Sequence, residues 1–190
     1  MLRTDIIDHH FGHERKICDQ FDDTYWLSHD KSGDFPHEFC SALAKNGWLG
    51  IAMPETQGGS GLGITEAALM MQTIAESGAA MSGCSAVHMN IFGPNVIVVF
   101  GNEEQKQRML PPLITGKTKA CFGVTEPDAG LDTTHLKTKA IPKNDHYLIS
   151  GHKVWTSTAQ VADKILLIAR TRPIEQCENC LLYTSSEPTS

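Results

Sequence analysis

Apolar side chains recur at three- and four-residue intervals along the first two thirds of the chain, which is typical of amphipathic helices. The pattern predicts helices over 14–29, 36–45, 65–76, 85–100 and 103–110. Asn102 precedes two glutamates and is expected to cap the fifth helix, while Gly93-Pro94 breaks the fourth and Pro111-Pro112 ends the fifth. Thr65 is expected to cap the third helix, whose apolar residues cover more than one face and predict burial.

The periodicity changes near Lys117, after which short apolar runs and alternation favour strands. We expect strands over 120–124, 136–141, 147–149 and 165–169, with a turn over 143–145. Helices followed by a run of strands are typical of an α+β arrangement of two packed units. We therefore divide the sequence into a helical domain over 1–116, a β domain over 117–173 and an irregular tail over 174–190.

Composition narrows the possible classes of protein. The chain has 190 residues and a formal net charge of -6, from 22 acidic and 16 basic residues. No basic stripe is visible, so we expect no nucleic-acid partner. The most apolar stretch, 95–100, is far shorter than the ~20 residues of a membrane helix, and the N-terminus resembles neither a signal nor a transit peptide. Because the six cysteines are scattered, free thiols in a reducing compartment are expected, in a soluble protein without a membrane partner.

Three further features are weak candidates for metal, redox or phosphate-binding sites. His9, His10 and His13 lack further metal ligands at matching spacing, so a solvated terminus is preferred to a metal site. The C-x-x-C at 177–180 lacks both the second pair of a zinc ribbon and the βαβ context of a thioredoxin-like site. The glycine-rich loop at 57–63 lacks a following Gly-Lys-Ser/Thr, so we interpret it as a helix connection rather than a phosphate cradle.

Two segments, 121–132 and 151–157, carry more information, because each follows a predicted strand with hydroxyl groups and backbone donors. Such a place can receive a planar heterocycle, with backbone N–H groups at its carbonyls, hydroxyls at its ring nitrogens and Trp155 against its face. The alternative is a turn capped by Thr125, with Trp155 as part of the core. On chemistry alone, this alternative is favoured.

The same two segments resemble signatures of the acyl-CoA dehydrogenase family. Thr125-Glu126-Pro127, with Ala129-Gly130 and Asp132, resembles T-E-P-x-A-G-S-D. Gly151-x-Lys153-x-Trp155, with a hydroxyl two residues later, resembles G-x-K-x-W-I-T. The segments 35–59 and 101–116 are similar to the family's opening segment and to its last helix before the β domain. The resemblance spans about 30–171 and reverses the preference for a plain turn.

The resemblance implies a function. The family binds FAD and removes two hydrogens from the Cα–Cβ bond of an acyl-CoA thioester, giving a trans-2-enoyl-CoA, with a glutamate as the base. It places Thr125 beside the pyrimidine edge of the flavin, Trp155 against the isoalloxazine and the Ser157 hydroxyl near N5, while Leu131 and Asp132 meet the substrate. The residues expected at the cofactor are Phe122, Gly123, Val124, Thr125, Trp155, Thr156 and Ser157.

Two departures from the family pattern affect these expectations. Leu131 stands where the family has a serine, so a polar contact to the CoA arm is lost or replaced by backbone. The implied fold is α+β, with an all-α domain followed by a partial antiparallel β domain, and nothing after Thr171 resembles the family's C-terminal helical bundle. We assign no catalytic residue, interpret Glu126 as ordering its loop, and expect the chain alone to be inactive. A truncated or misjoined coding sequence is a hypothesis for the tail.

Alternatives remain within and outside this family. An acyl-CoA oxidase or flavin monooxygenase shares the fold, and a non-catalytic binding module is a third possibility. The resemblance implies an electron-transfer protein or another acceptor as partner and a homodimer or homotetramer for the complete protein. The expected location is the cytoplasm, or the mitochondrial matrix in a eukaryote.

Overall fold

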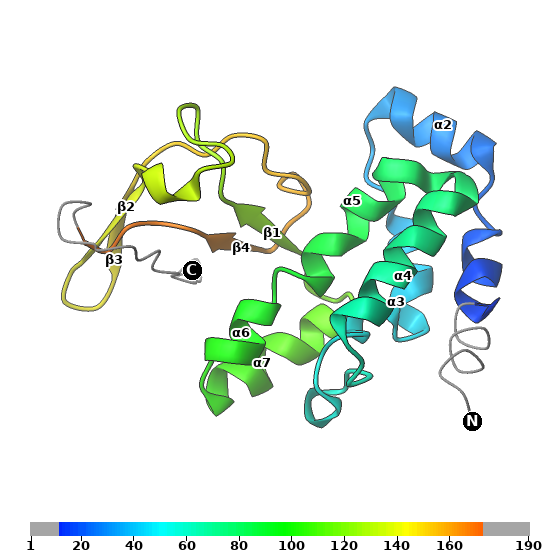
Figure 1. The fold of residues 1–190 in the computed structure, drawn as a ribbon, viewed down its shortest axis with the longest axis horizontal. Helices are drawn as coiled ribbons and strands as arrows, with labels where there is room; N and C mark the ends of the chain where they lie inside the picture. Colours follow the sequence, from blue (N-terminus) through cyan, green and yellow to red (C-terminus); the bar gives the residue numbers. More distant parts are fainter. Residues whose placement is uncertain (1–11, 173–190) are drawn as a thin grey trace. The chain divides into compact units, whose positions relative to one another are not determined.

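The computed structural model describes residues 12–172 and divides into two compact units, 1–119 and 120–190 (Figure 1). We call them the helical unit and the sheet unit, and each is described by itself. His9, His10, the C-x-x-C at 177–180 and the predicted tail lie outside the described residues.

The helical unit consists of helices joined by short turns. After a helical segment over 12–18 come α2 (Asp23–Ser32), α3 (His37–Lys45), α4 (Ile64–Ile74), α5 (Ala80–Ile91), α6 (Asn95–Phe100) and α7 (Glu103–Ile114). Single turns are found at η1 (Trp48–Gly50) and η2 (Glu55–Gln57), and a π-helical turn, η3 (Ala75–Ala79), joins α4 to α5. Helices α4 and α5 pack against each other and against η3.

One contiguous apolar core fills this unit. Phe39, Leu43, Met70 and Ile74 are fully buried within it, and residues from the first helical segment to α5 contribute to the same cluster. Glu14 is equally buried, and within residues 12–172 neither of its carboxylate oxygens has a hydrogen-bond partner. Burial without a partner disfavours the charged form, so the pKa of Glu14 is raised from 4.5 to about 8.

Several of the expected helix boundaries are wrong, among them the start at 85, since α5 begins at Ala80. The expected helix over 14–29 is two helices, because the Asp22 side chain accepts a hydrogen bond from the Tyr25 amide and starts α2 afresh. The cap expected at Thr65 is replaced by Gly63, whose amide donates to the Glu66 carboxylate. Residues 111–112 do not end α7.

Helix α7 continues through both prolines to Ile114. A proline lacks an amide donor, but the buried side chains of Leu110, Leu113 and Ile114 hold this last turn against the core. At the other end of α7, the cap expected at Asn102 is confirmed: its side chain accepts from the Gln105 amide, and the Gln105 side chain accepts from the Asn102 amide.

The run Ile64–Phe100 is long and apolar enough, by length and composition, to cross a membrane, with a mean hydropathy of 1.3. It is not one continuous helix. Gly78 has a φ of +98° at the kink between α4 and α5, and Pro94 precedes α6. Each of the three helices is shorter than the ~20 residues that a membrane span needs, and α4 and α5 contribute buried residues to the core.

The sheet unit is built from two pairs of short strands. Strands β1 (Ala120–Gly123) and β4 (Lys164–Leu167) run parallel, and β2 (Lys139–Pro142) and β3 (Tyr147–Ser150) form an antiparallel hairpin. The expected antiparallel pairing is thus confirmed for β2 and β3, whereas β1 pairs in parallel with a strand that follows long after it. The chain beyond β4 also bonds to β2, since the Ala140 amide donates to the Arg170 carbonyl.

Burial in the sheet unit is limited. The alternation expected over 136–141 is confirmed, because Leu136, Thr138 and Ala140 are buried while the residues between them are exposed. The apolar clusters are small, one of them formed by Ala129, Leu136 and Ile168. All four residues of β3 are exposed.

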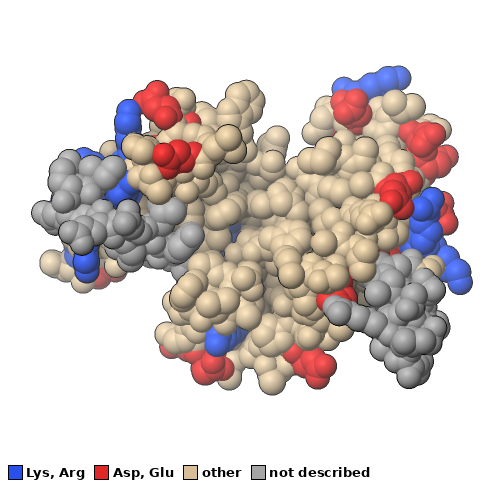
Figure 2. Space-filling model, in the orientation of Figure 1, with Lys and Arg blue, Asp and Glu red and all other residues tan. Residues whose placement is uncertain are grey.

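The charged surface agrees with the acidic composition. On the face drawn in Figure 2, the described lysine and arginine side chains lie scattered among acidic ones and form no continuous basic surface.

Candidate functional site

The first predicted segment begins within strand β1 and continues into the loop that follows it. The Gly123 carbonyl accepts a hydrogen bond of 3.0 Å from the Ile168 amide, just beyond β4. Phe122 and Val124 are half-buried and pack against the cluster of Ala129, Leu136 and Ile168. The chain therefore enters the loop at Thr125 from a fixed strand, and the Thr125 side chain is itself half-buried.

The loop that follows turns around Glu126. Its backbone exchanges two hydrogen bonds with Ala129, of 3.0 and 3.1 Å, which closes a tight turn. Its carboxylate is 5% exposed and accepts from the amides of Lys137 and Thr138 at 2.6 and 2.9 Å, and from the Lys153 ammonium at 2.8 Å. Burial alone would raise the pKa of Glu126, but these donors outweigh it and lower the pKa to about 2.

Lys153 fastens the second predicted segment to the first. Its ammonium donates to the Val124 carbonyl and to the Glu126 carboxylate, both at 2.8 Å, and its side chain is 9% exposed. One residue later, the Val154 amide donates to the Thr125 carbonyl at 2.9 Å. Three hydrogen bonds thus join the two signature segments.

A glycine is required where the second segment begins. A Cβ atom on Gly151 would lie 2.2 Å from the Thr138 hydroxyl oxygen and 2.7 Å from the Thr138 Cα. Because the backbone itself blocks the space, any side chain at Gly151 would push the segment away from Thr138.

Trp155 lies on the surface with an unusual backbone. Its side chain is 89% exposed, so the interpretation of Trp155 as part of the core is wrong. Its φ of +57° lies in the left-handed region, which costs a non-glycine residue about 1–2 kcal/mol. Ser157 is exposed and Thr156 half-buried. Strained residues of this kind cluster at binding sites, where the surroundings hold them in place.

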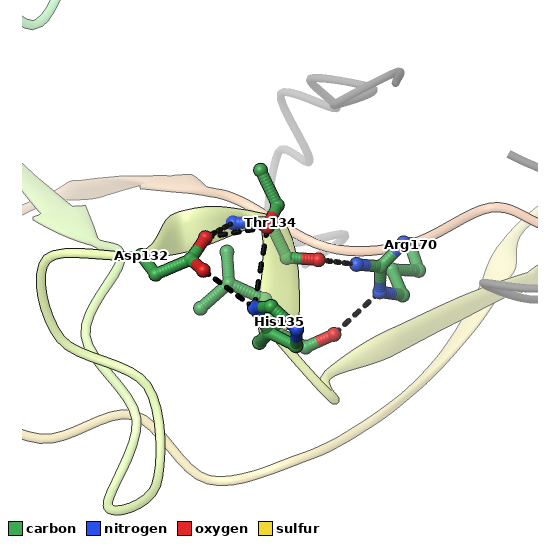
Figure 3. Close-up of polar contacts among 5 residues, drawn as sticks. Asp132, Thr134, His135 and Arg170 are labelled. Atoms are coloured by element: carbon green, nitrogen blue, oxygen red, sulfur yellow. Dashed lines mark hydrogen bonds and ion pairs between the residues drawn. The ribbon is translucent and has the colours of Figure 1, made fainter. Parts of the chain in front are cut away.

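The end of the first predicted segment, around Leu131 and Asp132, contains a separate cluster of hydrogen bonds (Figure 3). Leu131 is fully exposed. The Asp132 carboxylate accepts from the Thr134 amide at 3.0 Å, from the Thr134 hydroxyl and from the His135 ring at 2.7 Å, and the hydrogen bonds from Thr134 lower the pKa of Asp132. Arg170 donates to the Thr134 carbonyl. Asp132 therefore starts the turn η4 (Thr133–His135) and is committed to local bonds.

Sequence reasoning missed two supports of this region. Lys153 enters the sequence analysis only as a letter of a motif, and no local signal distinguishes a lysine in a buried ion pair from the usual exposed one. Arg170 was not singled out, and its bonds to the loop over 134–136 depend on contacts far along the chain. Among residues 12–172, no group of three or more histidine, cysteine or acidic side chains is arranged to hold a metal ion; His13 instead lies 3.1 Å from the Asn46 side-chain oxygen.

Comparison with known proteins assigns both units. Residues 14–117 match the family model "Acyl-CoA dehydrogenase, N-terminal domain", and residues 121–189 match "Acyl-CoA dehydrogenase, middle domain". The chain belongs to the acyl-CoA dehydrogenase family. The resemblance drawn from the signature segments is confirmed, as is the α+β fold class with its helical domain first.

Individual relatives agree with this assignment. The mitochondrial isovaleryl-CoA dehydrogenase of Bos taurus is 39% identical over 144 residues, which are 75% of this chain and 34% of the relative. The caffeyl-CoA reductase-Etf complex subunit CarC of Acetobacterium woodii is 36% identical over 145 residues, 75% of this chain and 37% of the relative. The structure of butyryl-CoA dehydrogenase from Megasphaera elsdenii aligns with a TM-score of 0.77 at 28% identity, over 91% of this chain and 46% of that one. The chain thus spans about a third of the length of these curated relatives.

Proposed function

We propose that this chain is the flavin-binding part of an acyl-CoA dehydrogenase, which removes two hydrogens from an acyl-CoA thioester. The observation that supports it most directly is the surface built at 124–125 and 153–157, where an exposed, strained tryptophan is fastened to the end of a strand. Family membership and the names of the acyl-CoA-dependent relatives supply the chemistry.

The residues present fit a planar cofactor such as FAD. The exposed Trp155 indole offers a flat apolar face, and the hydroxyls of Thr156 and Ser157 follow it directly. Thr125 supplies a further hydroxyl at the end of β1. When bound, FAD would supply the acceptor for the two electrons of the oxidation. Trp155 would bind and orient the ring, and the hydroxyl of Ser157 would donate to a ring atom that gains electron density.

The two buried glutamates of the described region are not suited to remove the substrate's α-proton. The Glu126 carboxylate is buried and takes three hydrogen bonds, and a pKa of about 2 makes it a weak base. Glu14 is buried in the core of the helical unit. We therefore assign this chain the binding of the cofactor and assign no base within it.

Flavin content tests the cofactor assignment. The protein purified without added flavin is expected to be yellow, or to quench the fluorescence of added FAD stoichiometrically. Trp155→Ala should weaken FAD binding, whereas His13→Ala, in the helical unit, should leave it unchanged. A colourless protein that ignores added FAD would contradict the proposal.

Acyl-CoA addition tests the substrate separately. Isovaleryl-CoA or butyryl-CoA, added without oxygen, is expected to perturb the absorption band of bound flavin. If the protein binds FAD but its flavin band does not respond to either thioester, the flavin assignment stands and the acyl-CoA assignment is refuted.

The acceptor and the assembly are further parts of the proposal. We propose an electron-transfer flavoprotein as acceptor, because one relative is named as a subunit of an Etf complex. In the complete protein, rapid anaerobic reduction of such an acceptor, with little peroxide formed in air, would support this proposal; abundant peroxide would favour an oxidase. We further propose a homodimer or homotetramer, located in the cytoplasm or the mitochondrial matrix.

A further inference from the structure

A buried ion pair joins the two segments that carry the candidate flavin surface. We propose that Glu126 and Lys153 are positioning residues, which set the affinity for flavin by holding Trp155 and Thr125 in register with each other. The inference rests on the proposed function. It goes beyond it because neither side chain is expected to touch the cofactor.

The pair joins three separate parts of the sheet unit. The Glu126 carboxylate binds the backbone just before β2 through the amides of Lys137 and Thr138. The Lys153 ammonium reaches across 27 positions of sequence to the same carboxylate and to the Val124 carbonyl. The bonds of Lys153 therefore end on the two residues that flank Thr125.

The position of Trp155 depends on these bonds. With its side chain 89% exposed, packing of the indole contributes little to holding it, and its φ of +57° is unfavourable for a tryptophan. The two residues immediately before Trp155 are held by hydrogen bonds: the Lys153 ammonium donates to Val124 and Glu126, and the Val154 amide donates to the Thr125 carbonyl. If Lys153 is released, the backbone at Trp155 is free to relax to a negative φ, which re-aims the indole.

A second lysine–carboxylate pair in the same loop offers a matched control. The Lys137 ammonium lies 2.7 Å from the Asp128 carboxylate, against 2.8 Å in the buried pair, but its side chain and that of Asp128 are 72% and 69% exposed. Exposed pairs contribute little, and this one does not join the two signature segments to each other. Lys137→Met keeps the backbone amide that Glu126 uses, so it removes the same kind of side chain without disturbing the buried pair.

The first measurement is the dissociation constant for FAD in the full chain. Lys153→Met is expected to raise it roughly tenfold or more, as expected for the loss of a charge-assisted hydrogen bond, and Lys137→Met to leave it unchanged. Because Lys153→Met leaves a buried carboxylate unpaired and can unfold the unit, the double variant Glu126→Gln/Lys153→Met is measured beside it. Removing both charges should restore the fold but not the affinity. Affinity that recovers together with stability would overturn the proposal.

A double-mutant cycle tests whether Lys153 acts through Trp155. In a Trp155→Ala background, the Glu126→Gln/Lys153→Met change should weaken FAD binding by much less than it does in the parent, because the side chain to be positioned is gone. Equal losses in both backgrounds would show that the pair supports the fold in general and would overturn the proposal.

A third measurement needs no flavin and so separates the two proposals. In the double variant, hydrogen exchange at the Val154 amide is expected to accelerate at least tenfold, and quenching of Trp155 fluorescence by iodide to change, while exchange at the Ile168 amide stays as in the parent. If the parent ignores FAD but these changes occur, the flavin assignment fails and the positioning role stands. Unchanged exchange at Val154 overturns the positioning role whether or not FAD binds.

Discussion

Among residues 12–172, the helical unit and the sheet unit each bury one glutamate, in opposite surroundings. Glu14 lies in a contiguous apolar core without a hydrogen-bond partner among residues 12–172, and its pKa is raised to about 8. Glu126 takes two backbone amides and a lysine ammonium, and its pKa is lowered to about 2. The ionised Glu14 carboxyl group therefore destabilises the helical unit, whereas the ionised Glu126 carboxylate stabilises the sheet unit.

The difference follows from how much apolar surface each unit buries. The helical unit has a core that runs from Ile17 to Ile91 and tolerates one poorly solvated group. The sheet unit has apolar clusters of three buried residues, so polar contacts contribute a larger share of its stability. The units should accordingly respond in opposite directions when their glutamates are altered.

The largest effect is expected from Lys153→Met. Removing one partner of a buried ion pair leaves the Glu126 carboxylate uncompensated, which should lower the free energy of unfolding of the sheet unit by about 4 kcal/mol. Hydrogen exchange of peptides from 120–172 measures the loss, with peptides from 23–114 as the internal reference. An effect below about 1 kcal/mol would show that this unit does not depend on its ion pair.

Glu14→Met should have the opposite sign. At pH 7 the buried carboxyl group is held with a pKa of about 8 instead of 4.5, so replacing it should stabilise the helical unit by about 3 kcal/mol. Denaturant unfolding followed by fluorescence of the buried Trp26 measures the gain. Glu14→Gln is the control, since its amide stays polar and buried and should recover less.

The stability gained by Glu14→Met should depend on pH. Because the folded pKa of Glu14 is above the unfolded value, the contribution to stability is complete below about pH 4.5 and is lost as the pH rises through about 8. The advantage of Glu14→Met over the parent should therefore vanish near pH 4 and grow toward pH 8. An advantage that is the same at both pH values would assign it to packing.

The sheet unit should lose stability at the other end of the pH scale. The folded pKa of Glu126 is below the unfolded one, so its contribution is complete above about pH 4.5 and is lost as the pH falls through about 2. Over this interval we expect a decrease of about 2–3 kcal/mol in the unfolding free energy of the unit. Glu126→Gln should flatten this acid limb, and an unchanged limb would assign it to other carboxyl groups.

The smallest effect is expected from Lys137→Met. Both partners of its ion pair with Asp128 are mostly exposed, so its loss should change the stability of the sheet unit by less than about 0.5 kcal/mol. A loss comparable to that of Lys153→Met would remove the distinction between buried and exposed pairs in this unit.

Local signals in the sequence were sufficient for part of the fold. The Asn102 cap, the break at Gly93-Pro94 and the alternation over 136–141 depend on neighbours in the chain, and the structure confirms them. Pro111-Pro112 was misread as the end of a helix because burial of Leu113 and Ile114, a tertiary effect, keeps the turn helical. The restart of a helix at Asp22 was misread because the apolar spacing continues across the break.

The candidate site depends on long-range contacts to a greater degree. The signature segments were recognisable as letters, but their contact through Lys153 and Val154 joins residues far apart in sequence. Chemistry alone favours Trp155 as part of the core, whereas its side chain is 89% exposed. The structure locates these segments side by side in the sheet unit, and the roles of individual residues at the flavin stay predictions.

The parallel pairing of β1 with β4 also sets an order of assembly. Everything from 124 to 163 lies between the two strands, so β1 has to wait for the closure of a long loop, whereas the hydrogen bonds that cap α7 at Asn102 join residues close in sequence. On a ribosome, the helical unit can complete its core before residues 164–167 have been synthesised. During that interval the strand Ala120–Gly123 trails an already folded unit as an unpaired apolar edge, the kind of segment that chaperones bind and that aggregates when they do not.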